Sequence, residues 1–122
     1  MSELEIKMRD DKTGFLPGEE LAGEVSWRVE PPSYSVELRL FWRTEGKGSR
    51  DVEVVESIGF VAPARQDRRE FRFQAPESPY SFSGKLVSIV WALELVLSPN
   101  EEIERLDIVI SPTGAEIAPA IA

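Results

Sequence analysis

The sequence contains neither cysteine nor histidine among its 122 residues. Without cysteine the chain forms no disulfide and offers no thiolate nucleophile, and it suits a reducing compartment. Without histidine it lacks the most common general base and the most common transition-metal ligand. Serine-histidine catalysis, cysteine-histidine catalysis and ordinary zinc sites are therefore excluded, and we expect no catalytic residue, no metal site and no cofactor.

The sequence also lacks a long apolar run. It opens with acidic residues rather than a signal-peptide pattern, and no segment approaches the roughly 20 apolar residues of a membrane span. The formal net charge of −8 would repel the phosphates of nucleic acids and anionic membrane surfaces. These features favour a cytoplasmic protein that binds no nucleic acid and does not insert stably into a membrane.

The sequence does contain a strong alternation of apolar and polar residues. In the first such run Leu4, Ile6 and Met8 alternate with charged residues, which is the period of a half-buried strand. Prolines and glycines separate the runs and leave room for little helix beyond one turn near 100–104. The predicted strands are 3–9, 21–29, 34–44, 51–61 with a bulge near Gly59, 69–74, 86–97 and 106–110. This spacing predicts an all-β fold, an immunoglobulin-like antiparallel β-sandwich of about seven strands over residues 1–114, followed by a short apolar tail over 115–122.

The segment Phe15–Trp27, FLPGEELAGEVSW, is interpreted as the entrance to a strand. Its proline-glycine pair forms a turn, and an alternating strand follows. Gly23 falls on the core face of that strand, where the missing side chain leaves room for a bulky neighbour such as Trp91. Glu19 and Glu20 are interpreted as a solvated approach to the strand, because no second acid-base group lies at a defined spacing from them.

Three segments carry a resemblance to a known family. They are PGE-x-L-x-G-x-V at Pro17–Val25, the TEGKG turn at Thr44–Gly48, and FRFQAPESPYSFSGKLVSIVWALEL at Phe71–Leu95. In their order and spacing, over residues from about 3 to 111, they resemble the arrestin-like domains. The resemblance implies an immunoglobulin-like sandwich that serves as a protein-binding scaffold or adaptor rather than an enzyme. Members of that family usually pair two such domains, and this chain is long enough for one.

The alternation also predicts a surface for a partner. If Trp42, Trp91 and Ile108 face the core, a set of apolar residues on the same three neighbouring strands faces outward. Those residues are Phe41, Val90, Ala92, Val96 and Val109. A contiguous exposed apolar set indicates an interface, so we expect it to bind a protein partner or a second copy in a homodimer. The alternative cover is the tail, through Ile117 and Ile121.

Two further motifs leave alternatives open. Pro31-Pro32-Ser33-Tyr34 spells PPxY, which is either a ligand for WW domains or a hairpin turn that opens the third strand. Acidic residues in the loops would meet at one end of an immunoglobulin-like sandwich and either bind calcium or repel one another as ordinary surface charges. They are Asp10, Asp11, Glu19, Glu20, Glu45 and Glu77. The calcium interpretation corresponds to a calcium-dependent adhesion or membrane module.

Two other function classes would depend on charged residues. Arg65, Arg68, Arg69 and Arg72 cluster around the fifth strand, where they form either a phosphopeptide patch or a charged edge that deters aggregation. A carboxylate-based glycoside hydrolase would need two carboxyl groups about 5 to 9 Å apart in a cleft. No sequence feature indicates such a cleft. The sequence therefore favours a non-catalytic module that binds through its apolar outer sheet face or through an exposed edge strand.

Overall fold

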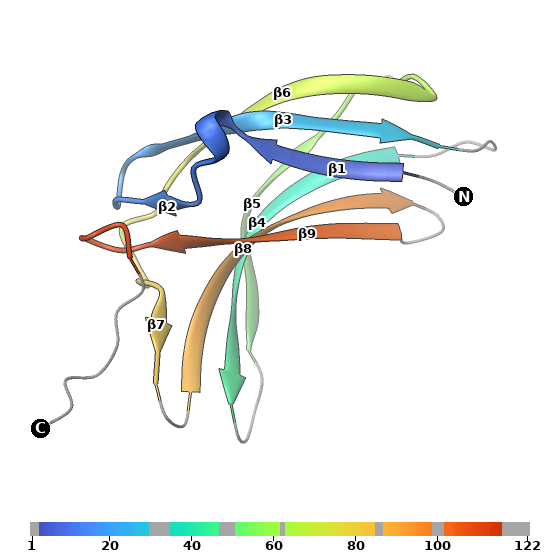
Figure 1. The fold of residues 1–122 in the computed structure, drawn as a ribbon. Helices are drawn as coiled ribbons and strands as arrows, with labels where there is room; N and C mark the ends of the chain where they lie inside the picture. The colour runs from blue at the N-terminus through green and yellow to red at the C-terminus, as the bar shows by residue number, and fades with distance from the viewer. Residues whose placement is uncertain are drawn as a thin grey trace, which may run out of the picture.

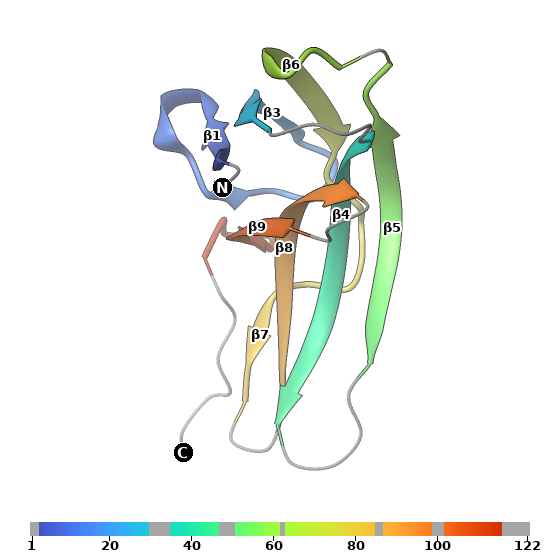
Figure 2. The ribbon, with the colours of Figure 1, turned by 90° about the vertical axis from the view of Figure 1, so that its right-hand side faces the viewer.

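A computed structural model describes residues 3–29, 35–46, 51–61, 63–84, 87–98 and 102–115. Two β-sheets face each other (Figures 1 and 2). The smaller sheet has the order β1 (Glu3–Met8), β3 (Glu20–Arg28), β6 (Gln66–Gln74). The larger sheet has the order β2 (Gly14–Phe15), β9 (Glu102–Ile110), β8 (Val87–Ser98), β4 (Ser35–Gly46), β5 (Val52–Gly59), and β7 (Phe82–Ser83) pairs with β8. The protein is therefore an all-β sandwich, as predicted.

Each of the predicted strands has a counterpart in the structure, but the predictions missed several local features. The two-residue strands β2 and β7 were not predicted, and β2 pairs with β9 in parallel, so the larger sheet is mixed. The predicted turn near 100–104 is wrong for Glu102–Glu104, which belong to β9, whereas 99–101 lie outside the described residues. A short 3-10 turn, η1 (Arg9–Asp11), follows β1 instead.

The β-bulge lies in β5, as predicted, but at a different residue. Leu40 of β4 pairs with Glu56, and the next residue, Phe41, pairs with Val54, so Val55 has no opposite residue. Gly59 instead pairs regularly with Glu37. A bulge bends its strand and strengthens the local twist, so the shift at Val55 sets how β5 curves along the sheet margin.

The core lies between the sheets and follows the predicted alternation. On β8, Trp91, Leu93 and Leu95 are fully buried, and they face side chains such as Leu21 and Phe73 from the smaller sheet. Full burial of one such side chain stabilises a fold by about 1.5–3 kcal/mol. The buried indole N–H of Trp91 donates to the Pro79 carbonyl at 2.8 Å, so this polar atom keeps a hydrogen-bond partner inside the core.

The two sheets differ in length. β4 and β8 have 12 residues each, and β4, β5 and β8 continue past the end of the smaller sheet (Figure 2). The smaller sheet therefore covers only part of the larger one. No helix in the described part of the chain is long and apolar enough to cross a membrane.

Gly23 lies on β3 between two neighbouring strands. It pairs with Met8 on β1 and with Phe71 on β6. A Cβ atom at this position would overlap the carbonyl oxygen of Lys7 and approach the Phe71 ring to 3.0 Å. The bulky neighbour that uses the space is therefore Phe71, and the prediction of Trp91 was wrong.

We predict that Gly23→Ala lowers the free energy of unfolding by about 1–3 kcal/mol, because the added methyl group overpacks the contact with Lys7 and Phe71. A lower midpoint of urea unfolding would measure this loss. Gly59→Ala is the matched control, since a Cβ atom at Gly59 meets nothing within 4 Å. Equal midpoints for the two variants would contradict the assignment.

Candidate binding surfaces

The outer face of the larger sheet holds the apolar residues that the sequence assigned to a partner. Phe41 and Ala92 are direct cross-strand partners on β4 and β8, and neither belongs to the core cluster between the sheets. Phe41, Ala92 and Val96 are nonetheless only 4%, 0% and 6% exposed. Val90 and Val109 are half-buried. The prediction of an exposed apolar surface is therefore wrong for Phe41, Ala92 and Val96. The prediction that these three residues lie on the outer side of the sheet is correct.

Charged side chains cover this face. The strand register sets Arg39, Glu94 and Arg105 in one row across β4, β8 and β9. Arg105 donates to Glu94 at 3.0 Å, and its guanidinium lies 5.5 Å from the centre of the Phe41 ring. Arg39 approaches Glu94 to 3.9 Å from the other side. Because long arginine stems pack on apolar groups while their charged ends stay in water, this row both buries Phe41 and presents charge outward.

The second surface is the outer edge of β5, which ends the larger sheet. In the described part of the chain β5 pairs with β4 alone, and every residue of β5 except Ile58 is exposed. Val52, Val54 and Val55 are 65%, 49% and 45% exposed. A strand edge with unpaired N–H and C=O groups and exposed β-branched side chains is a template for another strand.

The other sheet edges are protected. Both edges of the smaller sheet carry alternating charges, on β1 and on β6, and charged edges deter pairing with another chain. At the far end of the larger sheet the two-residue strand β2 pairs only with Val109 and Ile110, so the rest of β9 is a further edge, and it carries charges of both signs. Among the edges of the described strands, β5 is thus the one that combines several exposed valines with no basic residue.

The four arginines around β6 mostly pair with carboxylates rather than forming an open cationic patch. Arg68 contacts Glu24 at 3.1 Å, and Arg69 contacts Asp67 at 3.0 Å. Arg72 lies 4.0 Å from Glu20, and Arg65 is exposed. These pairs favour the charged edge over the phosphopeptide patch, the two interpretations that the sequence left open.

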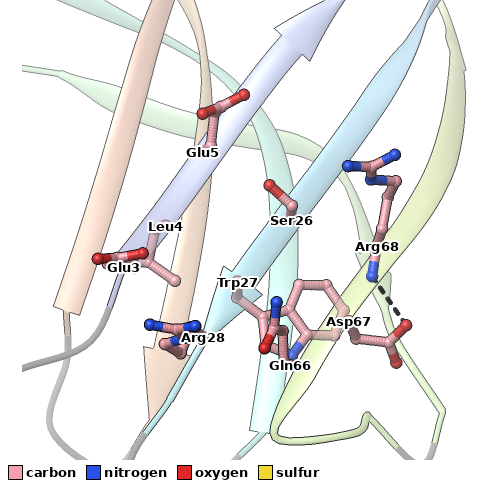
Figure 3. A pocket seen from close by; sticks show the side chains of 9 residues that line it. All are labelled: Glu3, Leu4, Glu5, Ser26, Trp27, Arg28, Gln66, Asp67 and Arg68. Atoms are coloured by element: carbon pink, nitrogen blue, oxygen red, sulfur yellow. Dashed lines mark hydrogen bonds between the residues drawn. The ribbon is translucent and has the colours of Figure 1, made fainter.

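A wide polar pocket of about 830 Å³ opens on the smaller sheet (Figure 3). Cross-strand pairing aligns Glu5, Ser26 and Arg68 in one row and Glu3, Arg28 and Gln66 in the next. The facing charges include carboxylates on β1 and guanidinium groups on β3 and β6. Sequence reasoning missed this pocket because no motif marks it, although the alternating polar residues of the three strands place them on one face.

Asp67 lines the same pocket and fixes the chain where β6 begins. Its carboxylate accepts hydrogen bonds from Arg69, from the Ala64 N–H at 3.1 Å and from the Arg68 N–H at 2.8 Å. These donors, the Arg69 side chain first, lower the pKa of Asp67 from 3.8 to about 2. The chain at Ala64 is thereby fixed beside Trp27, whose indole N–H donates to the Ala64 carbonyl at 2.8 Å.

The acidic loop residues do not converge on a metal site. Within the described residues no three Asp or Glu side chains lie close enough together to hold a metal ion. Glu19 accepts a hydrogen bond from Lys12, which lowers the pKa of Glu19, as does the Leu16 N–H. Glu20 and Glu45 lie beside arginines. The PPxY motif at 31–34, and Ile117 and Ile121 of the tail, lie outside the described residues.

Comparisons with known proteins support the fold. No protein-family model and no curated protein matches the chain. Among solved structures, the chain is similar to Spo0M, a sporulation control protein from Bacillus subtilis, with a TM-score of 0.59 and 19% identity over 90% of this chain. The chain spans about half of that protein, 49% of its length. Two β-glucosidase structures from Listeria innocua match with TM-scores of 0.44 and 0.43 and with 14% and 15% identity. Each match covers 90% of this chain but only 16% of the glucosidase chain, which is too weak to indicate a shared activity.

The likeness to Spo0M agrees with the resemblance in the sequence motifs. Both support an arrestin-like all-β fold, and the two-sheet architecture described above is that of an arrestin-like β-sandwich. At 19% identity the comparison with Spo0M supports the fold alone. The function is therefore argued from the surfaces of this chain.

We predict that Arg105→Ala destabilises the protein by about 1–2 kcal/mol, because Glu94 would lose its closest cation and Phe41 would lose its cover. The Glu94 side chain is 11% exposed, so water cannot replace the lost hydrogen bond fully. Urea unfolding measures the change. Arg68→Ala is the control, since its exposed pair with Glu24 should contribute less than about 0.5 kcal/mol. Equal losses in the two variants would contradict the role of the arginine cover.

We predict that Asp67→Asn removes part of the acid sensitivity of the fold. A carboxyl whose pKa is lowered by folding stabilises the native state above its unfolded pKa, and this contribution is lost as pH falls through the folded pKa. For Asp67 the loss lies between about pH 4 and the folded pKa of about 2. Melting temperatures at pH 2 to 5 should therefore fall less steeply for Asp67→Asn than for the wild type. Glu70→Gln, on the same strand, is the control, and unchanged steepness in Asp67→Asn would refute the prediction.

Proposed function

We propose that the protein is a non-catalytic binding module that takes an extended segment of a protein partner onto the edge of β5. The observation that carries this proposal is the exposure of a whole edge strand together with Val52, Val54 and Val55. Backbone hydrogen bonds would supply affinity, and alternate side chains would supply specificity, as in other cases of strand addition. The arrestin-like sandwich would act as the rigid support for that edge.

The edge of β5 is a better candidate than the outer sheet face. Phe41, Ala92 and Val96 have little area to offer a partner, and the arginines above them already have carboxylate partners. A partner on that face would first have to displace the row of Arg39, Glu94 and Arg105. Binding of a partner to the outer sheet face through Val90 and Val109 stays a prediction.

Two observations favour binding over catalysis. The chain contains no histidine or cysteine to act as a base or nucleophile. A carboxylate mechanism needs an acid kept protonated by its environment, as burial does in glycosidases. Glu3 and Glu5, the glutamates in the polar pocket, are exposed to water on the surface of β1.

The proposal predicts that Val54→Asn reduces capture of the partner by about tenfold or more. The variant removes apolar area and strand propensity from the β5 edge without changing net charge. Ile103→Asn is the matched control: Ile103 is 50% exposed, against 49% for Val54, but it lies on β9, beside β8 and away from β5. Pull-down from native lysate with mass spectrometry identifies partners bound by the wild type, and melting curves confirm that both variants fold.

The control also separates the two surfaces. Ile103 pairs with Val96, so it lies on the outer sheet face. A partner captured by Ile103→Asn and lost by Val54→Asn supports the β5 edge. The opposite pattern, or equal capture by both variants, would overturn the proposal.

A further inference from the structure

The charge on β5 is of one sign. Glu53 and Glu56 are its ionisable residues, and the strand contains no lysine or arginine. Within the described part of the chain neither glutamate forms an ion pair. The other long edges, β1, β6 and the part of β9 that β2 does not cover, carry both signs. The edge that is open to another strand is therefore also uniformly acidic.

The two glutamates share one side of the sheet. Glu53 pairs with Trp42 and Glu56 pairs with Leu40, so both lie on the core-facing side of β5. Val52 and Val54 pair with Arg43 and Phe41, on the outer side. Successive side chains of an added strand would alternate in the same way. One set would lie beside the glutamates and the other beside the valines.

A small pocket extends the acidic side toward β6. Glu56 lines a pocket of about 380 Å³ together with Gly18, Glu20, Arg72, Phe73 and Gln74. The guanidinium of Arg72 lies 4.0 Å from Glu20, and among the described residues Glu56 has no ion pair of its own. A long basic side chain from an added strand would reach Glu56 across this pocket, and its aliphatic stem would pack near Phe73.

A second copy of the chain is a poor occupant of this edge. If two β5 strands pair antiparallel with Val54 opposite Val55 of the second copy, Glu53 faces Glu56 of the second copy. Like charges directly opposite one another destabilise a strand pair. Each copy also has a net charge of −8, which adds long-range repulsion. The same glutamates that oppose self-association would attract a cationic strand.

We propose that the edge of β5 is the docking site for a basic extended segment of a partner protein. Lysine or arginine side chains of the segment would face Glu53 and Glu56, and β-branched side chains would lie against Val52 and Val54. This inference rests on the proposed function and adds the chemistry of the partner: strand addition requires only an open edge, whereas the selection of a basic segment requires the two glutamates.

The test is the selection of a random peptide display library against the intact protein. We expect the enriched peptides to alternate lysine or arginine with valine, isoleucine or threonine. Synthetic copies should shift the backbone amide resonances of Val52–Gly59 and bind more weakly as salt rises. The double variant Glu53→Gln/Glu56→Gln should bind them about fivefold more weakly at low salt. Glu3→Gln/Glu5→Gln, which removes two exposed charges from the edge strand β1, should bind them as the wild type does.

Four outcomes would overturn the inference. Peptides without basic residues that shift the β5 resonances would refute the charge selection while leaving the proposed function standing. Enriched peptides that shift only other strands, or a library that yields no binder, would refute docking at this edge. A dimer in sedimentation equilibrium that Val54→Asn converts to a monomer would show that a second copy is the occupant.

Discussion

The constraint on which this structure depends is the satisfaction of backbone hydrogen bonds at the margins of two open sheets. Inside each sheet the ladders pair the backbone groups, but the last strand of each sheet has one side without a partner. In this chain the margins differ in length, charge and apolar area. β1, β6 and the part of β9 beyond the short strand β2 carry charges of both signs, and β5 is long with exposed valines.

The sheet faces are closed by side chains of the chain itself. Between the sheets, alternating apolar residues such as Leu38 and Trp91 form a buried core. On the outside of the larger sheet, Arg105 and Arg39 lie across Glu94 and cover Phe41. A face covered in this way stays in water without exposing a large apolar patch. The molecule therefore presents charge on its faces and an open backbone on the edge of β5.

Much of the fold could be predicted from the sequence because two-residue alternation encodes which side of a strand is buried. This pattern placed Phe41 and Ala92 on the opposite side from Trp91, and the structure confirms that orientation. Orientation does not fix exposure, which depends on the side chains that neighbouring strands bring alongside. Arg105 is 64 positions after Phe41 in the sequence, and only the register of β8 and β9 brings it over the ring.

The missed features have similar causes. β2 and β7 have two residues each, too few for alternation to be detected, and their pairing partners are set by the rest of the sheet. The bulge at Val55 arises from how β5 pairs with β4. The prediction at Gly59 relied only on the ability of glycine to adopt unusual conformations. The edge of β5 was an alternative that the sequence left open. Choosing the edge of β5 over the outer sheet face required the order of the strands in the sheet, which local sequence patterns do not specify.

The central claim is that the outer edge of β5 is open in the isolated protein. Amide hydrogen exchange, measured residue by residue at a concentration where the chain is monomeric, tests it most directly. If the edge is open, alternate amides from Val52 to Gly59 exchange rapidly because they point away from β4, while the amides bonded to β4 exchange slowly. Slow exchange at every amide of β5 would show that another segment already covers the edge, and it would contradict the account.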